Sequence, residues 1–470
     1  MVVQHNMQAA NANRMLNVTT SAQSKSTEKL SSGYRINRAA DDAAGLTISE
    51  KMRKQIKGLD RASTNAEDGV SAVQTAEGAL TEVHSMLQRM NELATQSANG
   101  TNSNTDRKAI QDEIDQLTTE IDRVSETTKF NETYLLKGDG AEKAHNVNAH
   151  DAGLDGVTLT DKGDTVDVTL KTLNAGDKIS IAGKNYTIGG VTADVTTLLD
   201  NAKITGKDGD KVTINGTEYT YYSKADDNNT AVKKAGFFAK QPTVAEAANA
   251  NAAYTVDEIK ALKGATITAG GKSVTTIDDV NGVDKNDSNV ITAAKAYELE
   301  SAEIVKASSI GTDTNATAGN LTDNKFTLTK GKVNYNDALS FNLHVGADAD
   351  MTNKITVNID SMNSAGLGVK GIKADTEQDA TYAIDAIADA ISTVSSQRSS
   401  LGAVQNRLEH TINNLDNVVE NTTSAESRIR DTDMAEEMVN YSKNNILAQA
   451  GQSMLAQANQ SNQGVLSLLQ

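Results

Sequence analysis

One short segment contains the residue types that bind phosphate in nucleotide-binding loops. Gly271, Lys272 and Ser273 resemble the end of such a loop. A loop of this kind also needs a glycine five positions before Gly271, so that backbone N–H groups can surround the phosphate. The chain has Thr266 at that position. We therefore expect no nucleotide site in this segment.

The histidines and the acidic clusters are the candidate metal ligands. The six histidines lack the spacing of zinc proteases, and His145 and His150 lie five residues apart in a polar stretch, where solvation is expected. The acidic clusters at 284–287 and 348–350 lack the glycine and the terminal glutamate of a calcium loop. The sequence therefore predicts neither a metal site nor a cofactor.

Two aspartate pairs have the residue type of an acid–base dyad. Asp41 lies beside Asp42, and Asp431 lies two residues before Asp433. Arginines flank both pairs, so ion pairing at a joint between helices is the expected role. The chain has no cysteine, which excludes disulfides and thiol catalysis. We predict that the chain is not an enzyme.

The composition favours an elongated helical molecule over one deep globular core. Aromatic residues make up 3% of the 470 residues, with no Trp, although large aromatic side chains dominate ordinary cores. The formal net charge of −17 argues against binding to nucleic acid or to an anionic membrane. No stretch approaches 18 consecutive apolar residues, and residues 1–14 do not resemble a secretory signal peptide.

An apolar or small residue returns at every seventh position near both ends of the chain, which is typical of long helices that pack along a narrow seam. This heptad pattern runs from Met52 to Ala94 and again from Ile387 to Ile429, with a break at Thr422. Since a narrow apolar stripe is unstable in water, the two helices must pack on each other or on other copies. The expected seam residues are Leu59, Val73, Leu80, Leu87, Leu401, Leu408 and Leu415.

The ends of the first long helix carry start and stop signals. We expect it to begin near Ala44 and to end before Gly100, because glycine commonly terminates helices. Thr105 or Asp106 is expected to cap a second helix that contains Ile110.

The terminal segments 1–43 and 432–470 carry thinner apolar stripes. Their expected seam residues are Leu16, Leu30, Leu455, Leu466 and Leu469. Ordering a residue costs about 1–2 kcal/mol of backbone entropy, which such stripes do not recover in a single chain. We therefore predict that both termini are disordered in the free monomer and helical when copies associate.

Between the heptad regions the apolar pattern changes to the two-residue period of strands. Three segments share hairpin spacing, with a glycine followed three residues later by Ile or Val and a second glycine seven positions after the first. These segments are 176–188, 209–221 and 264–277, and Asn215-Gly216 is the clearest turn. The sequence thus predicts a β-rich insertion. A helix-prone patch at 243–263 follows Pro242, and a further strand pair is expected at 337–345 and 354–359.

Five segments of the helical ends form an ordered set of motifs. They are LSSGYRINRAADDAAGL at 30–46, LQRMNELATQSANGTNS at 87–103, IQDEIDQLTTEIDRV at 110–124, LGAVQNRLEHTINNL at 401–415 and ILAQAGQSMLAQANQ at 446–460. Together they closely resemble bacterial flagellin, over roughly the first 137 and the last 130 residues. The middle of the chain matches no family pattern, as is usual for the variable outer part of flagellins.

The resemblance implies a homopolymer, the extracellular flagellar filament used for motility. It implies an α+β, multidomain fold with three parts: a filament-core domain of residues 1–43 and 432–470, a coiled-coil rod of 44–137 and 339–431 with a small β-hairpin, and a surface-exposed insertion of 138–338. The insertion is expected to contain two sub-modules, at about 138–241 and 242–338.

The resemblance also implies partners outside the polymer. It implies type III export of the unfolded chain without a cleaved signal peptide, an export chaperone on the tail from about Met434, and contacts with filament cap and junction proteins. It further implies recognition by host Toll-like receptor 5 in innate immunity. The positions that match this epitope are Gln88, Arg89, Glu92, Leu93, Gln96, Ile110 and Glu113.

The expected epitope is a rigid helix that presents Arg89 and an exposed Leu93, because arginine is a frequent interface anchor. Alternatively, Arg89 and Glu92 form only the polar flank of a seam whose core residue is Leu87.

The sequence departs from the flagellin pattern at both ends. Gln23 and Thr27 stand where similar flagellins often have aliphatic residues, and Gln470 stands where Arg is common. These departures weaken the expected pairing of the terminal helices. The alternatives are a hook–filament junction protein, which shares the helical ends, and a filament subunit with an adhesin-type insertion. The intact segments at 30–37 and 448–460 favour flagellin.

Overall fold

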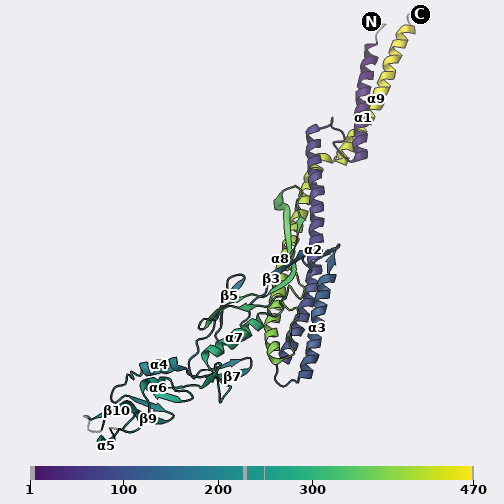
Figure 1. Ribbon diagram of the computed structural model, residues 1–470. Coiled ribbons are helices and arrows are strands. Elements are labelled where there is room, and N and C mark those ends of the chain that lie inside the picture. The colour runs from purple at the N-terminus through teal and green to yellow at the C-terminus, as the bar shows by residue number, and fades with distance from the viewer. Residues whose placement is uncertain (1–5, 226–229, 248, 468–470) are drawn as a thin grey trace. The chain divides into compact units, whose positions relative to one another are not determined.

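The computed structural model describes residues 6–225, 230–247 and 249–467 (Figure 1). Contacts divide the chain into two compact units. The first comprises residues 1–74, 341–357 and 401–470, and the second comprises residues 75–340 and 358–400. The three-part division expected from the sequence stays a prediction.

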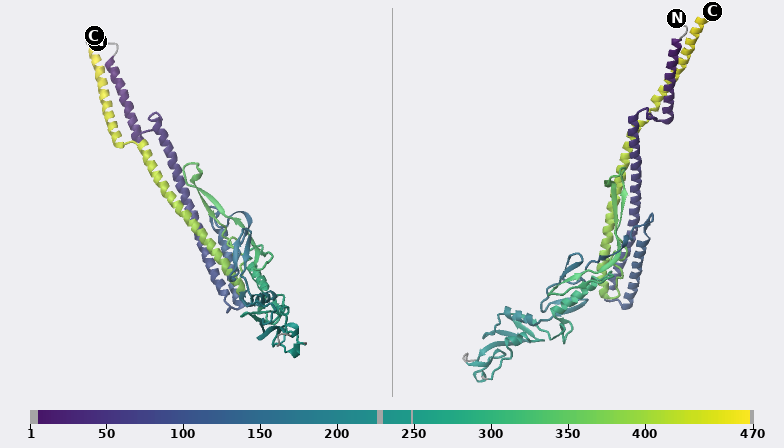
Figure 2. Two further views of the ribbon diagram at one scale, coloured as in Figure 1. Left: turned by 90° about the vertical axis from the view of Figure 1, so that its left-hand side faces the viewer. Right: turned by 45° about the horizontal axis from the view of Figure 1, so that its top comes forward.

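In the first unit, the terminal helices α1 (Met7–Ser32) and α9 (Met434–Ser467) lie side by side (Figures 1 and 2). The Asn6 side chain caps α1 by accepting from the Ala9 N–H at 2.9 Å, and it donates to the Ala458 carbonyl oxygen of α9 at 3.1 Å. Gly33 ends α1 with a φ of +76°, a left-handed conformation that glycine adopts without strain. The predicted disorder of both segments in the free monomer stays a prediction.

A short antiparallel bridge joins the segment that follows α1 to the segment that precedes α9, with Tyr34 opposite Asp431. The Arg35 N–H donates to the Arg430 carbonyl at 2.6 Å, and the Thr432 N–H donates to the Gly33 carbonyl at 3.0 Å. The prediction of ion pairs for the aspartates at this joint was wrong, because none of the four forms a salt bridge within the described part of the chain. Asp42 instead accepts from the Gly45 N–H, and Asp433 accepts from the Ala435 N–H. Both aspartates are therefore at helix starts, where a carboxylate complements unpaired N–H groups.

The long helices α2 (Ala43–Ser97) and α8 (Glu377–Arg430) pack along the predicted heptad seam. Arg430 of α8 pairs with Glu50 of α2 at 3.0 Å, and Arg398 pairs with Glu77 at 3.6 Å. The packing of long N- and C-terminal helices is thus confirmed. Leu59 is half-buried, and the other seam residues are buried: Val73, Leu80, Leu87, Leu401, Leu408 and Leu415.

A hairpin packs on the helices of the first unit. Strands β19 (Leu339–His344) and β20 (Lys354–Ile359) are antiparallel, as predicted, and the short helix η1 (Met351–Asn353) lies in their connection. A small hydrophobic cluster holds the hairpin, and its buried members are Ala66, Val345, Ile355 and Leu408.

In the second unit, helix α3 (Asn104–Thr127) follows α2 and presents Ile110, Ile114 and Ile121 to the interior. The predicted cap at Thr105 or Asp106 was wrong by a few positions. Ser103 is the N-cap, and its N–H donates to the Asp106 carboxylate at 3.0 Å in a capping box. A two-stranded hairpin, β1 (Lys129–Phe130) and β2 (Thr133–Tyr134), follows α3.

The described residues of the β-rich insertion form one ribbon and three sheets. The ribbon pairs β3 (Asp139–Asn146) with β18 (Lys332–Asp337). The four-stranded sheet has the order β16 (Thr317–Ala318), β17 (Lys325–Thr329), β5 (Thr165–Thr169), β4 (Thr158–Asp161). One five-stranded sheet has the order β13 (Asp279–Val280), β14 (Val283–Asp284), β15 (Val290–Ile291), β7 (Lys184–Ile188), β6 (Lys178–Ile181). The other has the order β10 (Ala231–Phe238), β9 (Thr217–Lys224), β8 (Lys211–Ile214), β11 (Thr266–Ala269), β12 (Lys272–Thr275).

The three predicted hairpins are confirmed as β6–β7, β8–β9 and β11–β12. At the turn between β8 and β9, Asn215 and Gly216 have φ values of +49° and +84°, as a two-residue hairpin turn requires. The helix-prone patch at 243–263 forms only two short helices among its described residues, α5 (Val244–Ala247) and α6 (Val256–Lys260). Two longer helices of the insertion were not predicted, α4 (Thr192–Asn201) and α7 (Ala293–Ala307).

Helix α7 places an acid inside the core of the insertion. Glu300 is 0% exposed, and both of its carboxyl oxygens lack a hydrogen-bond partner in the described part of the chain. Burial alone raises the pKa of this carboxyl to about 7, because the charged form loses its hydration. One turn further on, Glu303 accepts a hydrogen bond from the Tyr382 hydroxyl of α8 at 2.7 Å. The insertion therefore contains one satisfied and one unsatisfied buried carboxyl on the same helix.

Candidate assembly and recognition surfaces

The paired helices α1 and α9 leave large apolar side chains in solvent. We call these residues the terminal-helix surface: Met7, Met15, Val18, Met434, Met438, Val439, Ile446, Leu447 and Met454. Met7 is 75% exposed and Ile446 is 67% exposed. Single exposed apolar residues are common on proteins, so it is their number along two paired helices that makes the terminal-helix surface a candidate interaction surface.

The seam between α1 and α9 is only partly closed. Leu16, Leu30 and Leu455 are half-buried. An open groove of about 620 Å³ runs along the two helices and is lined by Met15, Met454 and small or amide side chains. The side chain of Leu466 and all of Leu469 lie outside the described residues. The terminal helices therefore have an open groove as well as exposed apolar side chains.

A second surface is formed by polar residues of α2 and α3, which we call the α2–α3 polar patch: Gln88, Arg89, Glu92, Gln96 and Glu113, all exposed. The Arg89 guanidinium bridges the two helices, with its Nε donating to Glu113 at 2.9 Å and its Nη1 donating to Glu92 at 3.2 Å. These contacts raise the pKa of Arg89, mainly through the hydrogen bond to Glu113. The patch is thus a charged, pre-oriented group of side chains on two packed helices.

The expected exposure of Leu93 was wrong. Leu93 is 2% exposed and Ile110 is also buried. Both side chains lie on the buried faces of their helices in the second unit. They therefore support the α2–α3 polar patch from inside and provide no exposed surface for a partner. The sequence does contain a signal for this burial. Leu93 lies next to the seam position Ala94, and Ile110 belongs to the apolar stripe of α3, whose residues are spaced four and three apart.

Arg107 closes the end of α2 beneath this patch, and the sequence reasoning missed it. It is buried on α3, and its guanidinium donates to the carbonyl oxygens of Ser97, Asn99 and Asn102, at 2.9, 3.0 and 3.0 Å. A cation at a helix C-terminus satisfies carbonyl groups that have no partner within the helix. The sequence signal that could have indicated this role is the position of Arg107. It lies four residues after the N-cap Ser103 and ten residues after Ser97, where α2 ends.

Two further features of the described residues bear on function. None of their helices is long and apolar enough to cross a membrane. They also contain no group of three or more His, Asp or Glu side chains arranged to hold a metal ion.

Comparison with known proteins identifies the family of this chain. Residues 3–141 match the model of the bacterial flagellin N-terminal helical region, and residues 384–469 match that of the C-terminal helical region. A flagellin of Clostridium tyrobutyricum is 41% identical over 98% of this chain and 100% of its own length. The chain belongs to the bacterial flagellin family. As a member of this family it is a structural, non-enzymatic subunit of the extracellular flagellar filament, and it polymerises with other flagellin subunits.

Other relatives of the flagellin family also align along the whole chain. Flagellin of Salmonella typhimurium is 35% identical over 97% of this chain and 96% of its own, and flagellin C of Vibrio cholerae is 34% identical over 99% of both. The solved structure of FliC from Burkholderia pseudomallei is 19% identical and covers 72% of this chain and 99% of its own, with a TM-score of 0.27.

Proposed function

We propose that the terminal-helix surface is where subunits of the filament contact one another, with the half-buried seam residues Leu16, Leu30 and Leu455 beneath it. The observation that carries this proposal is the exposure of apolar side chains on α1 and α9. Burying apolar surface stabilises association by about 25 cal/mol per Å². Since both helices pair along one side, their remaining faces are free to pack against neighbouring copies.

The remaining seam residues have a supporting role in this proposal. Leu59, Val73, Leu80, Leu87, Leu401, Leu408 and Leu415 hold α2 and α8 together, so that the terminal helices of each subunit start from a fixed place. Leu466 and Leu469 are proposed to extend the contacts of the tail.

Removal of residues 436–470 tests the assembly proposal. The truncated chain should form no filaments in electron micrographs under polymerising salt, while circular dichroism retains the helical signal of α2, α3 and α8. A matched variant that lacks residues 207–223, a pair of strands in the insertion, should still polymerise. Filaments of the tail-truncated chain would refute the role given to α9.

We further propose that the α2–α3 polar patch is a binding surface for Toll-like receptor 5. Five exposed residues of the patch are available for contact, and Arg89 is already oriented by Glu92 and Glu113. An arginine with an ordered guanidinium loses little conformational freedom on binding, which favours its use as an interface anchor. Leu93 and Ile110 are proposed to position the two helices from the inside.

The receptor proposal is tested with Arg89→Ala. Loss of this anchor should weaken binding of the monomeric chain to the receptor ectodomain by more than about 1 kcal/mol. Arg123→Ala is the matched control, because Arg123 is also exposed on α3 and also pairs with a glutamate, Glu120, outside the patch. Equal affinities of the two variants in calorimetric titration would overturn the assignment.

Three further proposals concern export of the chain and its partners outside the polymer. We propose that the chain leaves the cell unfolded through the flagellar type III apparatus, that a chaperone covers the apolar tail from about Met434, and that cap and junction proteins contact the assembled filament. The apolar residues of α9 support the chaperone proposal, because Met438, Val439 and Ile446 are exposed without a partner copy.

A further inference from the structure

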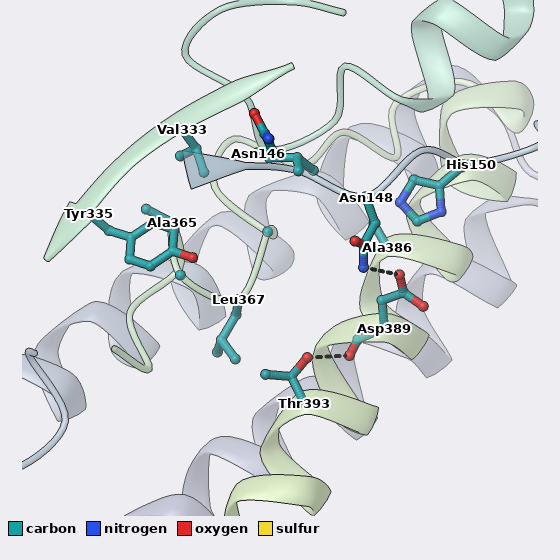
Figure 3. Close-up of a pocket in the computed structure, with 13 residues that line it drawn as sticks. Asn146, Asn148, His150, Val333, Tyr335, Ala365, Leu367, Ala386, Asp389 and Thr393 are labelled. Carbon is teal, nitrogen blue, oxygen red and sulfur yellow. Dashed lines mark hydrogen bonds between the residues drawn. The ribbon is translucent and has the colours of Figure 1, made fainter. Parts of the chain in front are cut away.

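A cavity in the second unit has the lining of a small-ligand site, and it lies outside the surfaces proposed above for assembly and for receptor binding. It has a volume of about 240 Å³ and lies between the β3–β18 ribbon, the loop at 365–368 and helix α8 (Figure 3). This volume is below the range of about 300–1,000 Å³ for pockets that hold drug-sized ligands. The polar side chains Asn148, Asp389 and Thr393 of the lining are exposed, so the cavity opens to solvent. A small ligand of about the size of one sugar ring is therefore the expected occupant.

Polar groups line one side of the cavity. The Asp389 carboxylate of α8 accepts a hydrogen bond from the Asn148 amide at 3.2 Å, which fixes both side chains (Figure 3). The amide nitrogen of Asn146 is held by Asp164 at 2.7 Å. The imidazole of His150 lies beside this group, and its backbone is fixed by the Ser308 hydroxyl at 3.0 Å. Asn148 and Asp389 are thus oriented before any ligand arrives, and oxygen atoms of Asp389 remain available as acceptors, whereas the Asn146 amide points away from this group (Figure 3).

Apolar groups and a phenol complete the lining. Val333, Leu367 and Ala386 are buried residues of the lining. The ring of Tyr335 is held by stacking on His145, with ring centroids 4.0 Å apart and an angle of 18° between the planes. Its hydroxyl forms no hydrogen bond to the described residues, so it can donate to a ligand. The cavity therefore combines an apolar wall with convergent donors and acceptors, the usual composition of sites for small polar molecules.

The charge of the lining selects the chemical class of the ligand. None of the described lining residues is Lys or Arg. Burial raises the pKa of Asp385, one turn before Asp389, His150 lowers it, and the carboxylates of Asp151 and Asp389 raise it. Asp389 is the acidic side chain among the described lining residues, and its carboxylate disfavours an anionic ligand.

We infer that this cavity binds a polyhydroxylated ligand the size of one sugar ring, either neutral or carrying an amine. Ring hydroxyls pair with Asp389, Asn148 and His150, since carboxylates and amides together accept and donate the hydrogen bonds that adjacent hydroxyls need. The C–H face of the ring packs on Leu367 and Val333. The ligand is a free monosaccharide or the terminal sugar of a glycan, which have the same chemistry at this site.

Titration of the full-length monomer tests this inference. The probes are glucose, galactose, glucosamine, their methyl glycosides and glucose 6-phosphate, followed by saturation-transfer NMR and calorimetry. At least one neutral or amino sugar should bind with a Kd of about 1 mM or tighter, and glucose 6-phosphate should bind at least tenfold more weakly than glucose. Binding of the methyl glycoside indicates a glycan terminus, and binding of the free sugar alone indicates a monosaccharide. No saturable binding by any neutral or amino sugar would overturn the inference.

Two substitutions on α8 place the ligand in the cavity. Asp389→Asn keeps the shape and should weaken binding at least tenfold, whereas Asp416→Asn, an exposed aspartate elsewhere on the same helix, should leave it unchanged. Thr393→Phe should fill the cavity and abolish binding. Its control is Thr381→Phe, because both threonines are exposed and both hydroxyls donate to the carbonyl four residues earlier. Binding that survives both Asp389→Asn and Thr393→Phe in folded protein would place the ligand elsewhere and refute the assignment.

Discussion

The two helix pairs of this chain share one seven-residue pattern and differ in how completely a single chain buries it. In the α2–α8 pair, Val73, Leu80, Leu401 and Leu408 are fully buried. In the α1–α9 pair, Leu16, Leu30 and Leu455 are half-buried, and Ile446 is largely exposed. Heptad spacing therefore specifies a helix with an apolar stripe. Whether one chain can bury that stripe alone depends on how wide and how densely apolar the stripe is.

The width of the stripe explains this difference. The α2 seam has a second row of apolar residues, and Ala62, Ala76, Val83 and Met90 of this row are all buried. On α1 the second row is interrupted by Asn, Thr, Ser and Gln. The α2–α8 seam is therefore buried within one subunit, whereas the proposal above is that neighbouring subunits complete the α1–α9 seam.

The largest expected effect comes from a charge in the complete seam. Leu401 is 0% exposed. Leu401→Asp should lower the free energy of unfolding by about 4 kcal/mol, because a buried large apolar side chain is lost and an unpaired carboxylate replaces it. Urea denaturation followed by circular dichroism measures the change. An unchanged unfolding midpoint would show that this seam is not the main support of the two long helices.

The insertion provides a second contrast, since its free energy of unfolding should depend on pH through Glu300 on α7. Glu300 keeps its proton up to about pH 7 in the folded chain, whereas an unperturbed glutamate loses it near 4.5. The stability contributed by the protonated form is therefore present below pH 4.5 and is lost as the pH rises to about 7. The loss is at most about 3 kcal/mol.

Glu300→Gln should remove this pH dependence. Tyrosine fluorescence during urea denaturation reports mainly on the insertion, because most of the 11 tyrosines lie there and the chain has no Trp. The wild type should lose stability between pH 5 and pH 8, and the variant should not. Glu298→Gln is the control, since Glu298 is exposed on the same helix. Equal pH slopes in wild type and Glu300→Gln would contradict the assignment.

Replacement of the buried Arg107 tests whether this side chain satisfies the carbonyl groups at the end of α2. Arg107→Met keeps the apolar stem but leaves three carbonyl groups without their charged donor, so the free energy of unfolding should fall by about 2 kcal/mol. Thermal denaturation measures the change, with Arg123→Met as the exposed control. If the two variants melt at the same temperature, solvent rather than Arg107 satisfies these carbonyls.

The smallest effect on monomer stability is expected in the incomplete seam. Ile446 has little contact to lose in a single chain, so Ile446→Asp should change the free energy of unfolding by less than about 0.5 kcal/mol. Sedimentation under polymerising salt should nevertheless show failure to assemble, because the charge would be buried between subunits. A variant that polymerises normally would remove Ile446 from the contact surface.

The helices were predictable from sequence because their signals are local. Seven-residue spacing located α2 and α8, and glycine spacing located the three hairpins. The cap at Ser103 was missed because three neighbouring polar residues carry similar capping signals, and only the backbone geometry selects one of them. Helix α7 was missed because its stripe faces a core assembled from distant strands, such as β5 and β17.

The candidate sites were less predictable for a related reason. Exposure depends on what covers a side chain, so heptad counting identified the residues near Arg89 but gave the wrong exposure for Leu93. The sugar-sized cavity was invisible in the sequence, because Asn148, Leu367 and Asp389 come from three separated segments that only the fold brings together.

Hydrogen exchange by mass spectrometry, compared between monomer and filament, tests the central claim most directly. Amides of α2 and α8 should be protected in both states, since their seam is complete in one chain. Amides of α1 and α9 should exchange freely in the monomer and become protected in the filament. Strong protection of α1 and α9 in the monomer, with no further gain in the filament, would contradict the claim that neighbouring subunits complete this seam.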